Sequence, residues 1–154
     1  MIYSNQEMRE VTHMKHISIK SVSTATNAGI ACEHDLYFAL TGKIRDRHDH
    51  TPFDKGSDIE ELHLSVKSSN ATLASKLNGD SLEEMVADYF ERCASTLWGY
   101  VTKDRTAYLM NRNEFANFLN EFGTLDRAST KNGGQKIVRI KKESKKMLAW
   151  LSQC

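Results

Sequence analysis

The sequence has a single proline, three cysteines and no long apolar stretch, and each shortage excludes a class of protein. No apolar run approaches the roughly 20 residues of a membrane-spanning helix, and the N-terminal residues lack the apolar run of a secretion signal. Because Cys32, Cys93 and Cys154 follow no metal-ligand spacing and are odd in number, we expect reduced thiols in a cytoplasmic protein. The sequence also lacks a Gly-x-Ser-x-Gly motif and a P-loop, which excludes two common classes, the serine hydrolases and the ATPases.

What the sequence does have is an ordinary globular composition with an uneven distribution of charge. Its 154 residues suit one domain with a hydrophobic core. The net charge of +1 conceals a basic segment, residues 124–154, in which eight Lys or Arg and two acidic residues give +6, so that the rest of the chain carries −5. We predict a single domain over 1–154 whose basic C-terminal segment could bind phosphates. A solvated strand and helix would explain the same segment.

The spacing of apolar residues predicts a mixed α/β domain. Helical periodicity over Ile17–Leu40 predicts one helix, or two that meet near Asn27, and Gly42 ends it. The polar segment Lys43–Gly56 predicts a loop, and strict alternation over Leu62–Ser69 predicts a strand with one apolar and one polar face. The remaining patterns predict helices over 81–93, 111–122 and 144–151, and strands over 97–102, 107–110 and 136–140.

Asp58 and Lys67 are the residues around which a catalytic site could be built. The alternation puts Lys67 on the polar face of what looks like a central strand, where a half-buried lysine needs a function or a partner. Asp58 falls at the expected end of the preceding strand. A carboxylate that holds a divalent metal and a lysine that orients the attacking water can together hydrolyse a phosphodiester. In the alternative reading, Asp58 caps a turn and Lys67 is a surface residue paired with a carboxylate.

These residues resemble the motif of the PD-(D/E)xK nuclease superfamily, whose members carry an Asp at the end of one strand and an acidic-x-Lys triplet on the next. The order helix, strand hairpin, helix, strand is similar, and the spacing of Asp58, Ser65 and Lys67 is like that in mismatch-repair nicking endonucleases. Many members also carry a Glu on the first helix, which Glu33 matches. The resemblance implies a restriction-endonuclease-like core with a mixed central sheet flanked by helices, a Mg²⁺ or Mn²⁺ cofactor, and double-stranded DNA as partner. A homodimer would supply the two sites that double-strand cleavage needs.

The sequence departs from the family at Ser65, where an acidic residue or sometimes Gln is usual. A hydroxyl is a poor substitute for a metal-binding carboxylate, so the missing ligand would come from Glu60 or Glu61 in the neighbouring turn, or from Glu33. Alternatively the chain is a relative that has lost cleavage, or a deliberately inactivated variant. The sequence therefore predicts a metal-dependent DNA endonuclease or an inactivated one. The alternative is a catalytically silent module that binds DNA or a protein, such as a mobile-element or inhibitor protein.

Polar residues on both sides of this motif are candidates for contacts with the DNA backbone. They comprise Ser68, Ser69 and Asn70 directly after the lysine, and Lys131, Lys136, Arg139 and Lys141 in the basic segment. Two other groups could take part in the chemistry. His63 would share the polar strand face with Lys67 and could transfer a proton, and the loop offers His48, Asp49, His50 and Asp54 as rival metal ligands.

Overall fold

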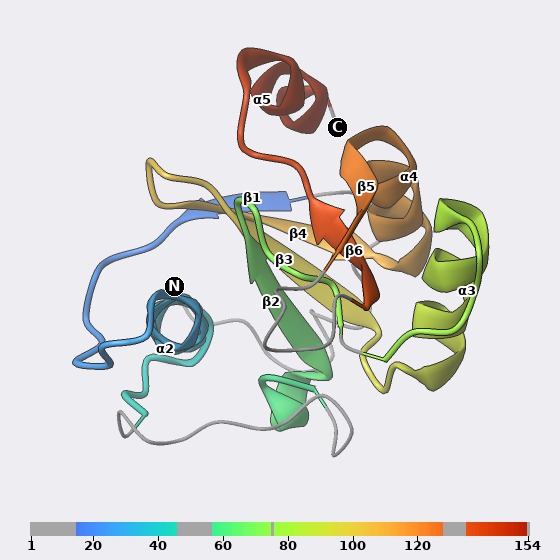
Figure 1. Ribbon diagram of the computed structural model, residues 1–154. Coiled ribbons are helices and arrows are strands. Elements are labelled where there is room, and N and C mark those ends of the chain that lie inside the picture. Colours follow the sequence, from blue (N-terminus) through green and yellow to red (C-terminus); the bar gives the residue numbers. More distant parts are fainter. Residues whose placement is uncertain (1–14, 46–56, 75, 128–134, 154) are drawn as a thin grey trace.

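The computed structural model describes residues 15–45, 57–74, 76–127 and 135–153. Within these ranges the chain is an α/β domain with four helices, a mixed four-stranded sheet and a two-stranded hairpin (Figure 1). The helices are α2 (Ala28–Thr41), α3 (Leu82–Arg92), α4 (Arg112–Phe122) and α5 (Lys145–Ser152), with a 3₁₀ turn, η2 (Glu60–Leu62). The strands are β1 (Lys15–Ser18), β2 (Leu64–Ser68), β3 (Leu97–Val101), β4 (Thr106–Asn111), β5 (Gly123–Arg127) and β6 (Lys136–Ile140).

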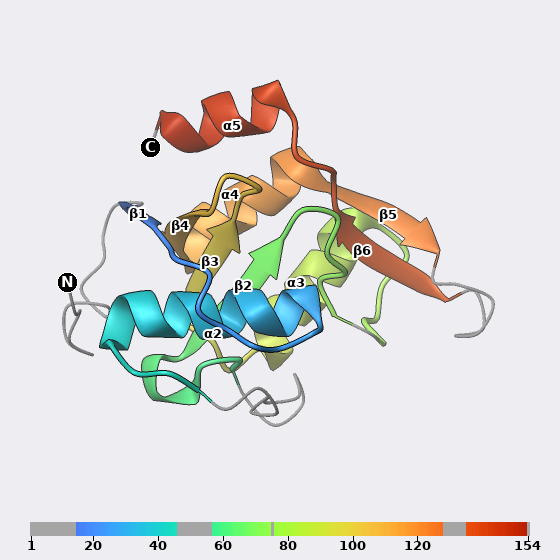
Figure 2. The same ribbon diagram turned by 90° about the vertical axis from the view of Figure 1, so that its left-hand side faces the viewer.

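The main sheet separates two hydrophobic cores. Its strand order is β1-β4-β3-β2, with β2 parallel to β3 and the other neighbours antiparallel. Helix α2 covers one face, while α3 and α4 cover the other (Figures 1 and 2). Strand β3 contributes to both cores, because Leu97 and Val101 pack on the α2 side whereas Trp98 and Tyr100 pack on the α3 side. The result is a three-layer arrangement in which β2 is the outermost strand on one side of the sheet.

The close approach of α2 to the sheet depends on Gly99 in β3. A Cβ atom at this position would lie 2.7 Å from Cδ2 of Leu36, a fully buried residue of α2. A larger residue at position 99 would therefore push the helix away from the strand. This contact matters for the site below, because α2 carries one of its acidic residues.

Most of the predicted elements are confirmed, but the first predicted helix is wrong over its N-terminal half. Residues 15–18 form β1, in which Ile17 pairs with Ala107 of β4, and residues 19–27 are irregular. The helix begins only after Asn27, whose side chain accepts a hydrogen bond from the backbone of Ile30, and it ends at Gly42 with a φ of 75°. Strand pairing and contacts from elsewhere in the chain thus override a local helical periodicity.

Two further differences concern strands. Strand β2 begins at Leu64, since residues 60–62 form η2, and it lies at the edge of the four-stranded sheet and not at its centre. Strand β5 was not predicted, because only its first residue is buried and the rest carry no clear alternation. In the part of the chain that the structure covers, no helix has the length and apolar character needed to cross a bilayer.

The hairpin of β5 and β6 is joined to the segment that follows β2. Strands β5 and β6 pair with each other, and residues 71–73 run along the other edge of β6. The backbone N–H of Leu73 donates to the carbonyl of Val138 at 2.8 Å, and that of Ile140 donates to the carbonyl of Ala71 at 2.8 Å. These bonds bring the C-terminal segment beside the part of β2 that carries Lys67.

Candidate active site

Asp58 lies along the outer edge of β2. The next residue, Ile59, forms an antiparallel bridge with Leu64, so that residues 59–64 make a tight hairpin around η2. One carboxylate oxygen of Asp58, Oδ2, then accepts a hydrogen bond from the backbone N–H of Val66 at 2.8 Å. The side chain therefore takes the place that a neighbouring strand would occupy, and the carboxylate is fixed at the sheet edge.

Glu33 reaches Asp58 from the helix above. It belongs to α2, is only 6% exposed, and shares a hydrogen bond with the Asp58 side chain. Burial, and next to it the negative charge of Asp58, raises the pKa of Glu33 to about 8, although the positive charges of Arg45 and Lys67 act in the opposite direction. Glu33 is therefore largely protonated at neutral pH, and its protonated side chain lies next to that of Asp58.

Lys67 is the third member of the cluster. Its ammonium donates to the backbone carbonyl of Leu73 at 2.8 Å. Burial lowers the pKa of Lys67, while the nearby charges of Asp58, Cys93 and Glu33 partly offset this effect. The structure thus brings together Glu33, Asp58 and Lys67, three residues selected from the sequence, from separate segments of the chain.

Arg45 is a site residue that sequence reasoning missed. One of its guanidinium nitrogens donates to the backbone carbonyl of Asp58 at 2.9 Å, and its Cζ lies 5.3 Å from the centre of the Tyr37 ring. Tyr37 has its pKa raised by burial and by the charge of Glu61, to which it is hydrogen-bonded. Arg45 lies in a segment of mixed charge with no periodicity. The one available signal was Tyr37, which follows Glu33 by four residues and shares its helix face.

Ser65 and Glu60 do not complete the acidic pair. The Ser65 hydroxyl is 2.5 Å from that of Ser95, which in turn donates to Ser57 at 2.7 Å, and all three residues are buried. Glu60 is exposed on η2 and lines an open pocket of about 310 Å³ together with Ser57, His63 and Ala94. Among the described residues no group of three or more His, Cys, Asp or Glu could hold a metal ion. The candidate donor set is therefore the two carboxyl groups of Glu33 and Asp58.

The other predicted residues fall around this cluster or outside the described ranges. His63 has a left-handed backbone, with a φ of 48°, and is exposed at the end of η2, so the expectation that it shares a strand face with Lys67 is wrong. The loop residues His48, Asp49, His50 and Asp54, together with Lys131, lie outside the described residues.

The predicted DNA contacts gather where the segment that follows β2 pairs with β6. Ser68 ends β2, and the Ser69 hydroxyl accepts from the backbone N–H of Glu143 at 3.0 Å. Arg139 donates to the carbonyl of Asn70 at 3.2 Å and forms an exposed ion pair with Asp126. Lys136 begins β6 and the exposed Lys141 directly follows it. Ser69 and Asn70 therefore lie within four residues of Leu73, the partner of Lys67, and Arg139 pairs with Thr72 next to it.

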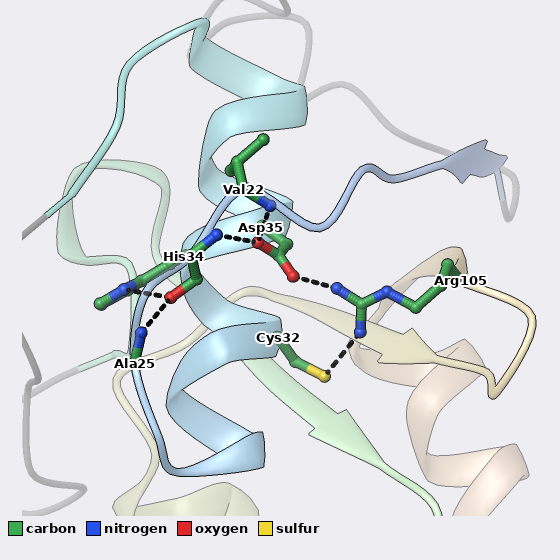
Figure 3. Close-up of polar contacts among 7 residues, drawn as sticks. Val22, Ala25, Cys32, His34, Asp35 and Arg105 are labelled. Atoms are coloured by element: carbon green, nitrogen blue, oxygen red, sulfur yellow. Dashed lines mark hydrogen bonds and ion pairs between the residues drawn. The ribbon is translucent and has the colours of Figure 1, made fainter. Parts of the chain in front are cut away.

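A second buried polar cluster fixes α2 (Figure 3). Asp35 is 2% exposed, accepts from the backbone N–H groups of Val22 and Ser23 at 2.8 Å each, and forms an ion pair with Arg105 in the β3–β4 turn. The other side of the guanidinium of Arg105 contacts Sγ of Cys32 at 3.5 Å. These bonds tie the helix that carries Glu33 to two other segments. The signal in the sequence was three consecutive polar residues, 33–35, inside an otherwise apolar helix.

No family model, curated protein or solved structure matches this chain. The chemistry of the site therefore follows from its own residues. Two carboxyl groups at a sheet edge suit Mg²⁺ or Mn²⁺, because such ions are often held by one or two carboxylates with water and phosphate oxygens completing the shell. A buried, protonated carboxyl group such as that of Glu33 can exchange its proton for a divalent cation.

Proposed function

We propose that the chain is a metal-dependent DNA endonuclease in which Glu33 and Asp58 hold Mg²⁺ or Mn²⁺ and Lys67 acts as the catalytic lysine. The observation that carries the proposal is the convergence of these three side chains at the edge of β2. Burying a carboxyl group and an ammonium near each other is costly, and such perturbed groups cluster at functional sites. A catalytic role of these groups would explain why the fold tolerates the free-energy cost of burying them.

The order of elements around the site supports a restriction-endonuclease-like core. Helix α2 is followed by the hairpin of residues 59–64, then by β2, α3 and β3, with β3 parallel to β2. This is the order that the superfamily resemblance implies. Glu33 lies on the helix, Asp58 directly precedes the hairpin, and the lysine lies on the strand that follows.

The residues of the site have separate tasks in phosphodiester hydrolysis. A bound divalent cation would supply positive charge to the phosphate and lower the pKa of a water molecule. Lys67 is held by the Leu73 carbonyl, and its ammonium can orient that water and stabilise negative charge as it develops. Its lowered pKa also brings it closer to the range in which it can exchange a proton. Asp58 and Glu33, once ionised, anchor the cation at the sheet edge.

The basic C-terminal segment supports double-stranded DNA as the substrate. Arg139, Lys136 and Lys141 lie on or next to β6, which pairs with residues 71–73 beside the site. Lysine and arginine side chains at this position can bind the phosphate backbone while the scissile bond reaches the acidic pair. Cleavage of both strands would require a second copy of the site, as in a homodimer.

Metal binding should depend on pH in a way that identifies Glu33. Because the pKa of Glu33 is raised to about 8, the carboxyl must lose a proton before it can bind a cation. We expect the affinity for Mn²⁺ to rise about tenfold per unit between about pH 6 and pH 8 and to level off above this range. Isothermal titration calorimetry in buffers of different ionisation enthalpy would measure both the affinity and the proton released.

The matched variants for this titration are Glu33→Gln and Glu121→Gln, the second on the exposed face of α4. Glu33→Gln should bind Mn²⁺ more weakly and with little pH dependence, whereas Glu121→Gln should behave as the wild-type chain. Binding of Mn²⁺ that is equally tight at all pH values in the wild-type chain would exclude Glu33 as a ligand.

A second candidate function, a DNA-binding relative without cleavage, is favoured by one observation. The position at which the superfamily usually has an acid is Ser65, whose hydroxyl is engaged by Ser95 within a buried chain of three serines. The two functions differ in what an added carboxylate would do. A silent relative would gain cleavage that it lacks, and an active enzyme would cleave faster.

We therefore expect Ser65→Asp to raise Mg²⁺-dependent cleavage at least about tenfold, because a third carboxylate strengthens the metal site. Nicking and linearisation of supercoiled plasmid would measure it, with Ser65→Glu as a second variant. The control is Ser18→Asp, which adds the same charge at the exposed end of β1, on the opposite edge of the sheet. Equal rates for Ser65→Asp and Ser18→Asp in folded proteins would argue against the site, and cleavage that persists in the double variant Ser65→Asp, Lys67→Ala would exclude the lysine.

A further inference from the structure

Arg45 brings a second cation to the acidic pair, from a different direction. Lys67 approaches from β2, whereas Arg45 follows α2 and lies over the ring of Tyr37 on that helix. Its guanidinium is fixed by two anchors, the face of the Tyr37 ring and the backbone carbonyl of Asp58 at 2.9 Å. Its charge is close enough to Glu33 to influence that carboxyl group. The side chain is half-buried and therefore keeps a path to solvent.

The charges of the cluster leave a surplus that an anion could balance. A divalent cation would neutralise the two carboxylates of Glu33 and Asp58. The positive charges of Lys67 and Arg45 then face the one negative charge of Glu61, which is hydrogen-bonded to Tyr37, so that one positive charge remains in excess. A phosphodiester carries one negative charge and gains more as its bond is broken. One lysine suffices to orient a water molecule, so Arg45 is not needed for that step and is available to bind an anion.

We propose that Arg45 binds the phosphate group of the substrate next to the Glu33–Asp58 pair. The inference rests on the proposed function and adds the residue that recognises the phosphate. Guanidinium groups suit this task because their planar fork of N–H donors matches two phosphate oxygens, and stacking on an aromatic ring leaves the edge of the plane available. In this arrangement Lys67 orients the attacking water molecule, and Arg45 binds the phosphate group.

The chain contains a closely matched control in Arg112. This residue also lies over an aromatic ring, with its Cζ 4.9 Å from the centre of Phe90, and it also donates to a backbone carbonyl, that of Phe90, at 2.9 Å. It belongs to α4, on the opposite face of the main sheet from α2. Replacing Arg112 removes the same kinds of contact as replacing Arg45. A difference in DNA affinity between the two variants therefore reports the effect of a guanidinium at position 45. It does not report the general effect of removing an arginine that is held by a ring and a carbonyl.

The test measures binding of a short fluorescein-labelled DNA duplex by fluorescence anisotropy, in EDTA and in Ca²⁺, over a range of salt concentrations. We expect Arg45→Ala to weaken binding about tenfold and to lower the salt dependence by about one phosphate contact. Arg45→Lys should keep the salt dependence but lose part of the affinity, because a lysine retains the charge without the fork. Arg112→Ala should bind within about twofold of the wild-type chain.

The outcomes separate the two proposals. If the wild-type chain binds and cleaves DNA while Arg45→Ala matches it in affinity and salt dependence, Arg45 has no role in phosphate binding and the proposed function stands. If the wild-type chain neither binds nor cleaves the duplex, the proposed function itself fails. Thermal denaturation of each variant identifies unfolded protein, and for an unstable Arg45→Ala the comparison of Arg45→Lys with wild type decides. Equal affinity of those two would overturn the proposal.

Discussion

Replacing Lys67 with methionine should reduce the rate of Mg²⁺-dependent DNA cleavage at least about 100-fold. Methionine has a similar length and fills the same space, but it can neither orient a water molecule nor stabilise negative charge. The ammonium of Lys67 is close enough to both acidic residues to be influenced by their charges, and it is fixed by the Leu73 carbonyl. The measurement is the initial rate of plasmid nicking at saturating Mg²⁺, with duplex binding followed separately.

The stability of the same variant gives an independent test. Burial lowers the pKa of Lys67, which means that the folded protein disfavours its charged form, so Lys67→Met should be as stable as the wild-type chain or more stable. The control is Lys103→Met, an exposed lysine in the β3–β4 turn, which should change neither rate nor stability. A folded Lys67→Met protein that cleaves as fast as the wild type would show that the lysine is structural.

Replacing Asp35 with alanine should lower the free energy of unfolding by about 3 kcal/mol. The side chain of Asp35 is 3% exposed, and its removal leaves two backbone N–H groups and the partly buried guanidinium of Arg105 without their acceptor. The large cost arises from these unpaired donors and not from the ion pair alone. Urea denaturation followed by circular dichroism would measure the change.

The exposed ion pair between Arg139 and Asp126 provides the comparison. Its side chains are 27% and 50% exposed, so Asp126→Ala should cost no more than about 1 kcal/mol. Asp35→Asn should be nearly as damaging as Asp35→Ala, because an amide places an N–H₂ group against donors. Equal costs for Asp35→Ala and Asp126→Ala would mean that the contacts around α2 contribute little to stability.

The elements that could be predicted from the sequence are those with local signals. Helices α3, α4 and α5 each follow a capping residue, namely Ser81, Asn111 and Ser144, whose side chain accepts from the backbone three residues later. Strands β3 and β4 have regular patterns and a short turn. The helical prediction fails over residues 19–27 because their backbone is held by Asp35 and by Arg105 in the β3–β4 turn, which are distant in sequence. No local pattern records such partners.

The residues of the candidate site could likewise be predicted only where the local sequence constrains their positions. Asp58 and Lys67 could be selected because their spacing and the alternation of β2 constrain where they lie, and Glu33 because it interrupts an apolar helix face. Arg45 could not be selected, since its position depends on the path of the chain after α2. The hydroxyl partners of Ser65 were equally hidden, because Ser57 and Ser95 reach it from other segments. The sequence was therefore sufficient to select the acidic residues and the lysine, whereas Arg45 and the partners of Ser65 required the three-dimensional structure.

The two backbone groups of Leu73 link separate parts of the molecule. Its carbonyl receives the ammonium of Lys67, and its N–H donates to Val138 of β6. If β6 docked one residue out of register, the peptide units around residue 73 would turn over, and their carbonyl would no longer face the lysine. Correct pairing of the β5–β6 hairpin with residues 71–73 is therefore required for Lys67 to donate to the Leu73 carbonyl. A misassembled chain would keep its acidic pair but lack the fixed ammonium beside it.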